Sequence, residues 1–489
     1  MERPLMKREL YNYDVFPLVF PKGEPTEITV KPLGAHVAFK GEYTLKVMRI
    51  DVGSPSYAAS SWNQTDYTLT PCEDGCLRFT YTAEAETELV ARLFKEDKRV
   101  AQFNLYALDD DLACRIPLRG DLHMHTCRSD GQEDPATVCA NYRKLGYDFI
   151  FVTDHGRYYP SLEAIAAYKN VDIPLNIMPG EEVHLPGTAV HIVNAGGLYS
   201  VNALLKTEGV LADGTYDENA PAPGCLTMRQ YAGQVAGLDC TRRETGGALD
   251  KRRFDETVEA PAQLTLEEYE AQIAAIEATC TDAPEGVDRH WYAVCCWAFD
   301  HIRKAGGLGV FAHPFWISDM WQMPEVFTRY MFAKQPFDAY EVLGGELYYE
   351  QNGFQASIYY DEYRNGRVLP IVGSTDSHGS TGHNPHNYDV CSTIVFAHEN
   401  ERTDIIRSIK DKYSVAVDTI SREYRLVGEH RLQKYACFLM ENFYPIHDRQ
   451  TTLDGEVMRQ YYVGDATADE ISALAVKSRA FMKKYIKTK

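Results

Sequence analysis

From Ile116 onward the chain alternates between short apolar runs and amphipathic segments that are long enough to form helices. A short continuous apolar run is typical of a strand buried on both faces, and consecutive parallel strands need a crossover connection, usually a helix. The apolar runs of this kind are Asp148–Val152, Leu175–Met178, Ala189–Val193, Leu308–Ala312, Ala339–Leu343 and Val368–Val372. Their number predicts an α/β fold in which parallel strands close into a barrel.

The two ends of the chain show different patterns. The first 115 residues hold short alternating runs, such as Tyr43–Asp51 and Glu88–Phe94, separated by turn-forming residues. This pattern predicts a small all-β domain of the immunoglobulin-like sandwich type. The expected division is a β sandwich over 1–115, the barrel over 116–422 with an insertion at 197–290, and a helical extension over 423–489. We expect the insertion to lie over one mouth of the barrel and to contain a helix around Leu264–Cys280.

Composition argues against two classes of partner. The chain has 70 acidic residues against 50 lysines and arginines, a formal charge of −20, and so acidic a surface repels nucleic acid. Apolar runs fall short of the roughly 18 residues of a membrane helix, and the charged start MERPLMKREL is unlike a signal peptide. We therefore expect a cytoplasmic protein without a membrane or nucleic-acid partner. The twelve cysteines form no CxxC pair, which argues against a structural zinc site, and the oligomeric state stays open.

Two motifs place ligand-type side chains two residues apart. His123 and His125 lie in a segment expected to be extended, where side chains at i and i+2 point the same way. Asp130 follows on a turn that can return its carboxylate to that face, and Asp376 with His378 repeats the spacing after another apolar run. Imidazoles and carboxylates at a strand end suit a borderline divalent ion such as zinc, manganese or iron.

Four further groups follow the same logic along the chain. They are Thr153-Asp154-His155, Gly180-Glu181-Glu182, His191, and Ala312-His313-Pro314. Five of the six groups fall at or just past the C-terminal end of a predicted strand, the edge at which barrel enzymes assemble their active sites. His191 is the exception, because it lies inside its predicted strand and is also compatible with a packed core histidine. Together the groups predict one polynuclear metal site.

This ordered motif set resembles the PHP family, named after polymerases and histidinol phosphatases, over roughly Ile116–Asp418 without the insertion. The resemblance implies a distorted (β/α)7 barrel with two or three divalent ions (Zn, Mn or Fe). The ligands it implies are His123, His125, Asp130, His155, Glu181, His191, His313, Asp376 and His378. It further implies that Glu181 bridges two ions and that Asp121 and Asp154 orient neighbouring imidazoles.

A charge count relates the number of ions to the substrate. Three carboxylates, three divalent ions and a bridging hydroxide leave an excess of about two positive charges, which suits a phosphate monoester. With two ions the excess disappears, and a neutral ester or amide is better tolerated. We therefore expect a metal-dependent phosphoesterase that hydrolyses a small organic phosphate by attack of a metal-bridging hydroxide.

Four residues are candidates for a catalytic role. His155 and His378 are candidates for protonating the leaving group, and Arg128 and Arg157 for binding phosphate through the guanidinium fork. For each arginine a surface salt bridge is an equally ordinary role. Additional candidate substrate contacts are His184, His383 and His386.

Two other functions stay open. Some PHP-like hydrolases attack carboxyl ester, carbamate or amide bonds, and these tend to carry a β domain before the GDLHxHT motif, as this chain does. The same Lewis-acid chemistry serves both bond types. The third interpretation is a non-catalytic barrel whose ions are structural while the β domain binds a partner.

Overall fold

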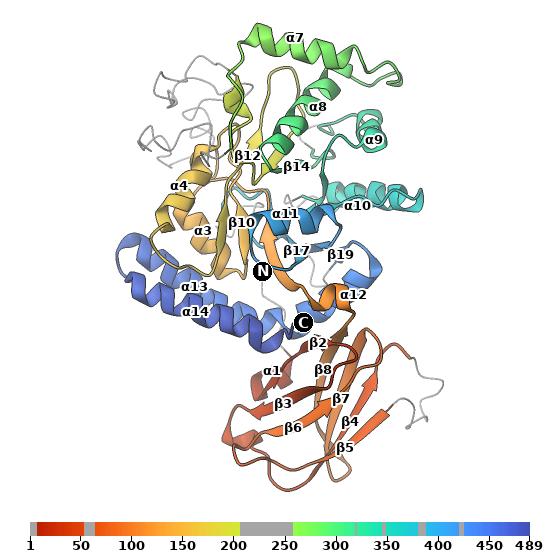
Figure 1. Cartoon of the computed structure of the whole chain (residues 1–489), viewed down its shortest axis with the longest axis vertical. Coiled ribbons are helices and arrows are strands. Elements are labelled where there is room, and N and C mark those ends of the chain that lie inside the picture. Colours follow the sequence, from red (N-terminus) through yellow and green to blue (C-terminus); the bar gives the residue numbers. More distant parts are fainter. Residues whose placement is uncertain are drawn as a thin grey trace.

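The computed structural model describes residues 7–52, 64–205, 258–317, 320–344, 349–379, 388–419 and 425–489. An all-β unit lies at one end of the molecule and a mixed α/β unit at the other, with the long C-terminal helices between them (Figure 1). Within these ranges, no helix combines the length and the apolar character that crossing a membrane requires.

The N-terminal unit consists of two sheets that share one core. Their strand orders are β1-β3-β6 and β2-β8-β7-β4-β5. Val30 and Phe79 of the first sheet lie in the same buried cluster as Val47 and Leu105 of the second. The immunoglobulin-like assignment stays a prediction. The elements are α1 (Arg8–Asn12), β1 (Tyr13–Phe16), β2 (Val19–Pro21), β3 (Thr26–Pro32), η1 (Ala35–Val37), β4 (Tyr43–Arg49), β5 (Gln64–Leu69), β6 (Leu77–Tyr81), β7 (Thr87–Lys95), β8 (Lys98–Leu108) and α2 (Asp110–Ala113).

The region from Ile116 is built on two further sheets. One has the order β11-β10-β9-β17-β18-β19 and the other β12-β13-β14-β15-β16. Phe149 and Val310, one from each sheet, lie in a common buried cluster, so the sheets curl around one core. Isolated bridges link them, and closure into a single (β/α)7 barrel stays a prediction. The strands are β9 (Ile116–Asp121), β10 (Phe149–Phe151), β11 (Asn176–Met178), β12 (Gly180–Val183), β13 (Ile192–Ala195), β14 (Leu308–Phe311), β15 (Ala339–Leu343), β16 (Ile371–Gly373), β17 (Cys391–Ala397), β18 (Ser414–Asp418) and β19 (Arg425–Val427).

The prediction of parallel strands is correct for only part of these sheets. β9, β10 and β11 run parallel, as do β14, β15 and β16. However, β13 is antiparallel to β12 and β14, and β17 is antiparallel to β9. The predicted strand Ala189–Val193 is observed as Ile192–Ala195, and the eight residues before it contain no helix. A connection this short returns the chain antiparallel, whereas a parallel pair needs a longer crossover.

Helices cover the outer faces of both sheets (Figure 1). They are α3 (Pro135–Lys144), α4 (Tyr159–Tyr168), α8 (Arg289–Lys304), α9 (Glu325–Lys334), α10 (Tyr349–Arg364) and α11 (Arg402–Lys410). Of the predicted insertion, residues 206–257 lie outside the described residues. The described part includes η2 (Asn202–Leu204) and α7 (Leu266–Glu277), the expected helix, which begins at a capping box on Thr265. Tyr269 of α7 packs against Trp297 of α8, with ring centroids 5.2 Å apart.

The C-terminal helices join the two units rather than standing apart. They are α12 (His430–Asn442), α13 (Tyr444–Val463) and α14 (Ala468–Tyr485). Asp454 of α13 binds Nη2 of Arg143 in α3 through an oxygen at 2.7 Å. After α14, the backbone N–H of Lys487 donates to the carbonyl of Val19 in β2 at 3.0 Å. The C-terminal segment therefore contacts both the α/β region and the β domain.

Candidate metal centre

Seven of the fifteen histidines and three carboxylates converge at one edge of the two curled sheets. Their ligand atoms form five overlapping groups, within each of which all the atoms lie within 4.8 Å of one another. The residues are His123, His125, Asp130, His155, Glu182, His184, His191, His313, Asp376 and His378. Eight of the nine predicted ligands belong to this cluster. Glu181 does not, and Glu182 and His184 are additional members.

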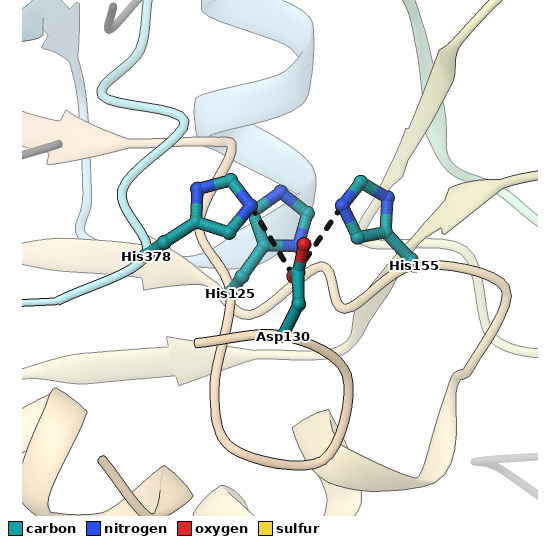
Figure 2. A group of neighbouring side chains, drawn as sticks. All are labelled: His125, Asp130, His155 and His378. Atoms are coloured by element: carbon teal, nitrogen blue, oxygen red, sulfur yellow. Dashed lines mark ion pairs between the residues drawn. The ribbon is translucent and has the colours of Figure 1, made fainter. Parts of the chain in front are cut away.

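One part of the cluster surrounds Asp130 (Figure 2). Its Oδ1 lies 3.2 Å from Nε2 of His378 and 3.5 Å from Nε2 of His155. The ring of His125 is stacked against both imidazoles, and its centroid lies 4.1 Å from that of His155 and 4.3 Å from that of His378. Asp130 returns to this position through a tight turn, in which a Cβ on Gly131 would lie 2.5 Å from the carbonyl oxygen of His125. Only glycine allows so close an approach.

Asp376 forms the second part of the cluster. Its Oδ1 lies 2.9 Å from Nε2 of His125 and 3.3 Å from Nε2 of His123, and its Oδ2 lies 3.8 Å from Nε2 of His313. The backbone of Asp376 has a φ of 48°, in the left-handed region, where a non-glycine residue is uncommon. A hydrogen bond from its N–H to the carbonyl of His123, at 2.9 Å, ties this loop to the one after β9. Such local strain is typical of functional sites.

Glu182, not Glu181, is the glutamate of the cluster. Oε1 of Glu182 lies 2.7 Å from Nδ1 of His191, and Oε2 lies 3.1 Å from Nε2 of His184. Glu181 instead accepts hydrogen bonds from Asn194, Ser200, Asn202 and the backbone N–H of Val201. The two residues are neighbours on β12, and successive side chains of a strand point to opposite faces. Glu181 therefore lies outside the cluster, and its described contacts give no support to the predicted role as a bridging ligand.

His191 joins the cluster because of the direction of its strand. It directly precedes β13, which runs antiparallel to β12 and β14. The start of an antiparallel strand lies at the edge where its neighbours end, so His191 faces the other ligands. Its 2.7 Å contact with Glu182 and a side chain that is 23% exposed are unlike the surroundings of a packed core histidine.

Partners behind the histidines hold their rings in place. Nδ1 of His378 lies 2.9 Å from the carbonyl oxygen of Asp376, and Nδ1 of His313 lies 3.2 Å from Oε1 of Gln322. Nδ1 of His123 lies 3.0 Å from Oε2 of Glu341 in β15, a residue that sequence reasoning did not place in the site. A charged residue in the middle of the apolar run Ala339–Leu343 was the available signal. Such partners fix the tautomer and the orientation of a ligating imidazole.

Asp121 and Asp154 do not orient imidazoles as predicted. Asp121 accepts hydrogen bonds from the backbone N–H groups of His123 and Thr375. Asp154 accepts from the backbone N–H of Thr126 and from the hydroxyl of Ser129. Both acids therefore brace the loops that carry the ligands, because buried carboxylates need donors and the loops supply them.

The expected role of Arg128 in phosphate binding is not supported. Its Nε and Nη2 donate to the two carboxylate oxygens of Glu163 in α4, at 2.8 and 2.7 Å. Arg128 is 3% exposed, so it is not a surface arginine either. Arg157 is completely buried. His383 and His386, the other candidate contacts, lie outside the described residues.

The donor set fits divalent ions. Both carboxylate oxygens of Glu182, Nε2 of His123 and of His313, and Nδ1 of His125 and of His191 are buried, and none of them has a hydrogen bond of good geometry within the described residues. The 2.7 Å contact between Glu182 and His191 is an ion-pair contact that does not meet that geometry. A buried polar atom without a partner is costly, and such atoms call for an ion or water. Imidazole nitrogens and carboxylate oxygens are the ligands that zinc, manganese and iron share.

Burial and neighbouring charges set the protonation of the cluster. Burial, with the charges of His155 and His378, lowers the pKa of His125 to about 3, so it is neutral, as a metal ligand must be. Burial opposes ionisation of Glu182, but the imidazoles around it hold the pKa of its carboxyl well below the usual range. Burial also favours neutral His378, yet the Asp130 carboxylate raises the pKa of His378 to about 9. Ion binding there would displace a proton.

Comparisons with known proteins give only a weak likeness. No protein-family profile and no curated protein matches the chain. A two-domain protein from Bacteroides vulgatus ATCC 8482, containing a predicted PHP-like metal-dependent phosphoesterase, aligns at 15% identity over 62% of this chain and 65% of its own, with a TM-score of 0.35. This chain thus spans less than two thirds of that protein.

Two further solved structures align at similar levels. A candidate metal-dependent phosphoesterase from Bifidobacterium adolescentis ATCC 15703 has 18% identity over 56% of this chain and 92% of its own, with a TM-score of 0.29. An amidohydrolase from Chromobacterium violaceum has 20% identity over 55% of this chain and 90% of its own, with a TM-score of 0.29. Because these scores are low, the assignment of function depends on the site geometry.

Proposed function

We propose that the protein is a metal-dependent hydrolase and, within that class, a phosphoesterase acting on a small organic phosphate. The observation that carries this proposal is the convergence of seven histidines and three carboxylates on one buried cluster. A structural zinc site is closed by four protein ligands. Ten ligands in overlapping groups instead indicate more than one ion, with ligands shared between them and coordination positions left for water and substrate.

Each carboxylate would contribute to a different ion in this proposal. Asp130 would act with His125, His155 and His378, Asp376 with His123 and His313, and Glu182 with His184 and His191. Bound divalent ions would stabilise charge that develops on the reacting group and activate water at neutral pH. The chain's own residues contribute orientation, because Glu341, Gln322 and the Asp376 carbonyl hold the rings before substrate binds.

Charge favours a phosphate substrate if three ions bind. The cluster still contains three carboxylates, because Glu182 takes the place that the predicted ligand set gave to Glu181. Three divalent ions would therefore leave an excess of positive charge that attracts a phosphate dianion. Arg128 is paired with Glu163, so the ions rather than this guanidinium would meet the phosphate charge. His155 and His378, which share Asp130, remain the proposed proton donors to the leaving group.

A second candidate function is supported by the same ion pair. Glu163 neutralises the charge of Arg128, and Glu341 adds a carboxylate behind His123. A centre of two ions would therefore carry no excess of positive charge. A neutral carboxyl ester, carbamate or amide would then fit the cluster better than a dianion. The number of bound ions therefore distinguishes the two candidates.

One experiment tests both candidates. Purified protein would be loaded with zinc or manganese, its metal content measured, and its turnover compared on p-nitrophenyl phosphate, p-nitrophenyl acetate and a p-nitrophenyl carbamate. We expect phosphate hydrolysis that is lost in His123→Ala and Asp376→Ala and kept in His430→Ala, an exposed histidine on α12. Turnover of only the acetate or carbamate would replace the first candidate with the second. Bound metal with no turnover of any of them would contradict both.

A further inference from the structure

A second group of buried polar side chains lies on the first turns of α10. Gln351, Asn352 and Gln355 have exposed fractions of 1%, 1% and 0%, although amide side chains are mostly exposed in folded proteins. Spacings of three and four residues place them on one side of the helix. We call these three residues the amide pocket.

Hydrogen bonds within the amide pocket fix its orientation and leave several atoms unused. Oδ1 of Asn352 accepts from the backbone N–H of Gly344 at 2.8 Å and from Nε2 of Gln355 at 3.3 Å. Nδ2 of Asn352 and Oε1 of Gln355 are therefore the remaining ends, and neither has a hydrogen-bond partner in the described part of the chain. Both polar atoms of Gln351 lack one there too. Buried atoms of this kind call for a bound water, ion or ligand.

The amide pocket adjoins the metal centre at Gly344, the residue after β15. A Cβ built on Gly344 would lie 3.1 Å from Nε2 of Gln351, 3.2 Å from Cβ of His313 and 2.8 Å from Oε1 of Glu341. Gln351 is thus close to a proposed metal ligand and to the carboxylate behind His123. A molecule held by these amides would lie next to the ions.

The surroundings of the amide pocket indicate what it binds. Amides donate and accept hydrogen bonds without carrying charge, which complements a hydroxyl group. The rings of Phe315, Trp321 and Phe354, the last of which belongs to α10 like the amides, pack against one another as an aromatic wall, with centroids 5.1–5.9 Å apart. Phe354 lies three residues from Gln351 on α10 and is 37% exposed. A mostly apolar wall with a few placed polar groups is the usual composition of a small-molecule site.

We infer that the amide pocket binds the uncharged, hydroxylated part of the substrate, a sugar-like polyol, while the metal centre acts on its ester bond. This inference rests on the proposed hydrolase function and specifies its substrate class. The hydroxyl groups complete the hydrogen bonds of Gln351 and Asn352, and the aromatic wall packs against the carbon framework. The amide atoms that lack a partner among the described residues are then a recognition surface rather than part of a structural network.

Gln351→Met tests the inference, because it keeps the side-chain length and removes both unpartnered atoms. We expect the ratio of kcat/KM for glucose 6-phosphate to that for p-nitrophenyl phosphate to fall roughly tenfold. The thermal midpoint should stay the same or rise, since the Gln351 side chain forms no hydrogen bond with any described residue. The matched control is Asn442→Leu. Asn442 is also buried but accepts from Lys7 and donates to the carbonyl of Phe438, so its loss should lower the midpoint and leave the ratio unchanged.

A lowered midpoint with an unchanged ratio in Gln351→Met would overturn the inference. If the wild type hydrolyses neither phosphate, the phosphoesterase proposal fails. The inference about the amide pocket is then tested separately, by the effect of glucose on the thermal midpoint. Glucose stabilises proteins generally by exclusion from their surface. The measure of binding is therefore the glucose-induced rise in the thermal midpoint of the wild type minus the rise in Gln351→Met. An excess in the wild type supports the inference, and equal rises overturn it.

Discussion

Nδ1 of His123 lies 3.0 Å from Oε2 of Glu341, and both side chains are completely buried. The histidine follows β9 and the glutamate belongs to β15, so the pair connects the two curled sheets. It directs Nε2 of His123 toward Asp376, at 3.3 Å, and Glu182, at 3.5 Å. A carboxylate behind an imidazole in this way orients the ring and raises its basicity as a ligand.

Removing this carboxylate should weaken ion binding. We expect Glu341→Ala to lower metal affinity about 10- to 100-fold, measured by competition with a chelator, and Glu341→Gln to recover part of the loss because its oxygen still accepts. Glu350→Gln, at an exposed position in the first turn of α10, is the control. Equal affinities in all three variants would show that Glu341 does not support the metal centre.

The two adjacent glutamates of β12 should behave differently. Glu182→Gln should lose bound metal, because it removes a carboxylate that contacts several imidazoles. Glu181→Gln should retain metal but unfold more easily, by about 1–3 kcal/mol, since its four hydrogen bonds hold the segment from Asn194 to Asn202. Metal analysis and urea unfolding of both variants check this. Metal loss confined to Glu181→Gln would reverse the assignment.

The Arg128–Glu163 pair should contribute to stability rather than to substrate binding. The pair is bidentate, with side chains 3% and 17% exposed, and leaving one partner unpaired costs about 3–5 kcal/mol when the pair is buried. We expect Arg128→Met and Glu163→Gln each to lower the free energy of unfolding, and the double variant to lose less than the sum. A raised KM for a phosphate substrate in Arg128→Met, with stability unchanged, would restore the predicted role in phosphate binding.

His447 should make stability depend on pH. Burial favours its neutral form, but Asp148, whose Oδ1 lies 3.0 Å from Nε2, raises the pKa of His447 above its ordinary value. The folded state therefore binds the proton more tightly than the unfolded chain. This contribution to the free energy of unfolding is fully present below about pH 6.5 and is lost as the pH rises through the raised pKa.

The comparison of wild type with His447→Gln isolates this effect. Urea unfolding between pH 5.5 and 9 should show wild-type stability falling with pH relative to the variant, whose amide still donates to Asp148 but does not titrate. The opposite slope, or parallel curves, would contradict the raised pKa of His447.

Much of the metal centre could be predicted from local spacing. The pairs His123 and His125, and Asp376 and His378, lie two residues apart at the ends of apolar runs, and such runs end at one edge of a curled sheet. These inferences need no knowledge of the partner strand, because the side-chain period of extended backbone is a local property.

Glu181 and Arg128 show where local reasoning stopped. The two glutamates of β12 are adjacent, so the local sequence does not distinguish them. The pairing of Glu182 with Val193 and the curl of the sheet decide which of the two faces the cluster. Arg128 lies between two ligands in sequence, yet packing places α4 and its Glu163 against it. Such a choice depends on residues far along the chain.

Residue type and short-range spacing were thus sufficient to predict an α/β fold and the edge at which the candidate ligands of a metal centre gather. Long-range pairing placed Glu182 rather than Glu181 in the cluster and Glu341 behind His123. It also set the antiparallel direction of β13, through which His191 joins the cluster, and paired Arg128 with Glu163. The physical reason is that a side chain's direction follows from local backbone geometry, whereas its partner is set by the packing of elements that the chain connects over hundreds of residues.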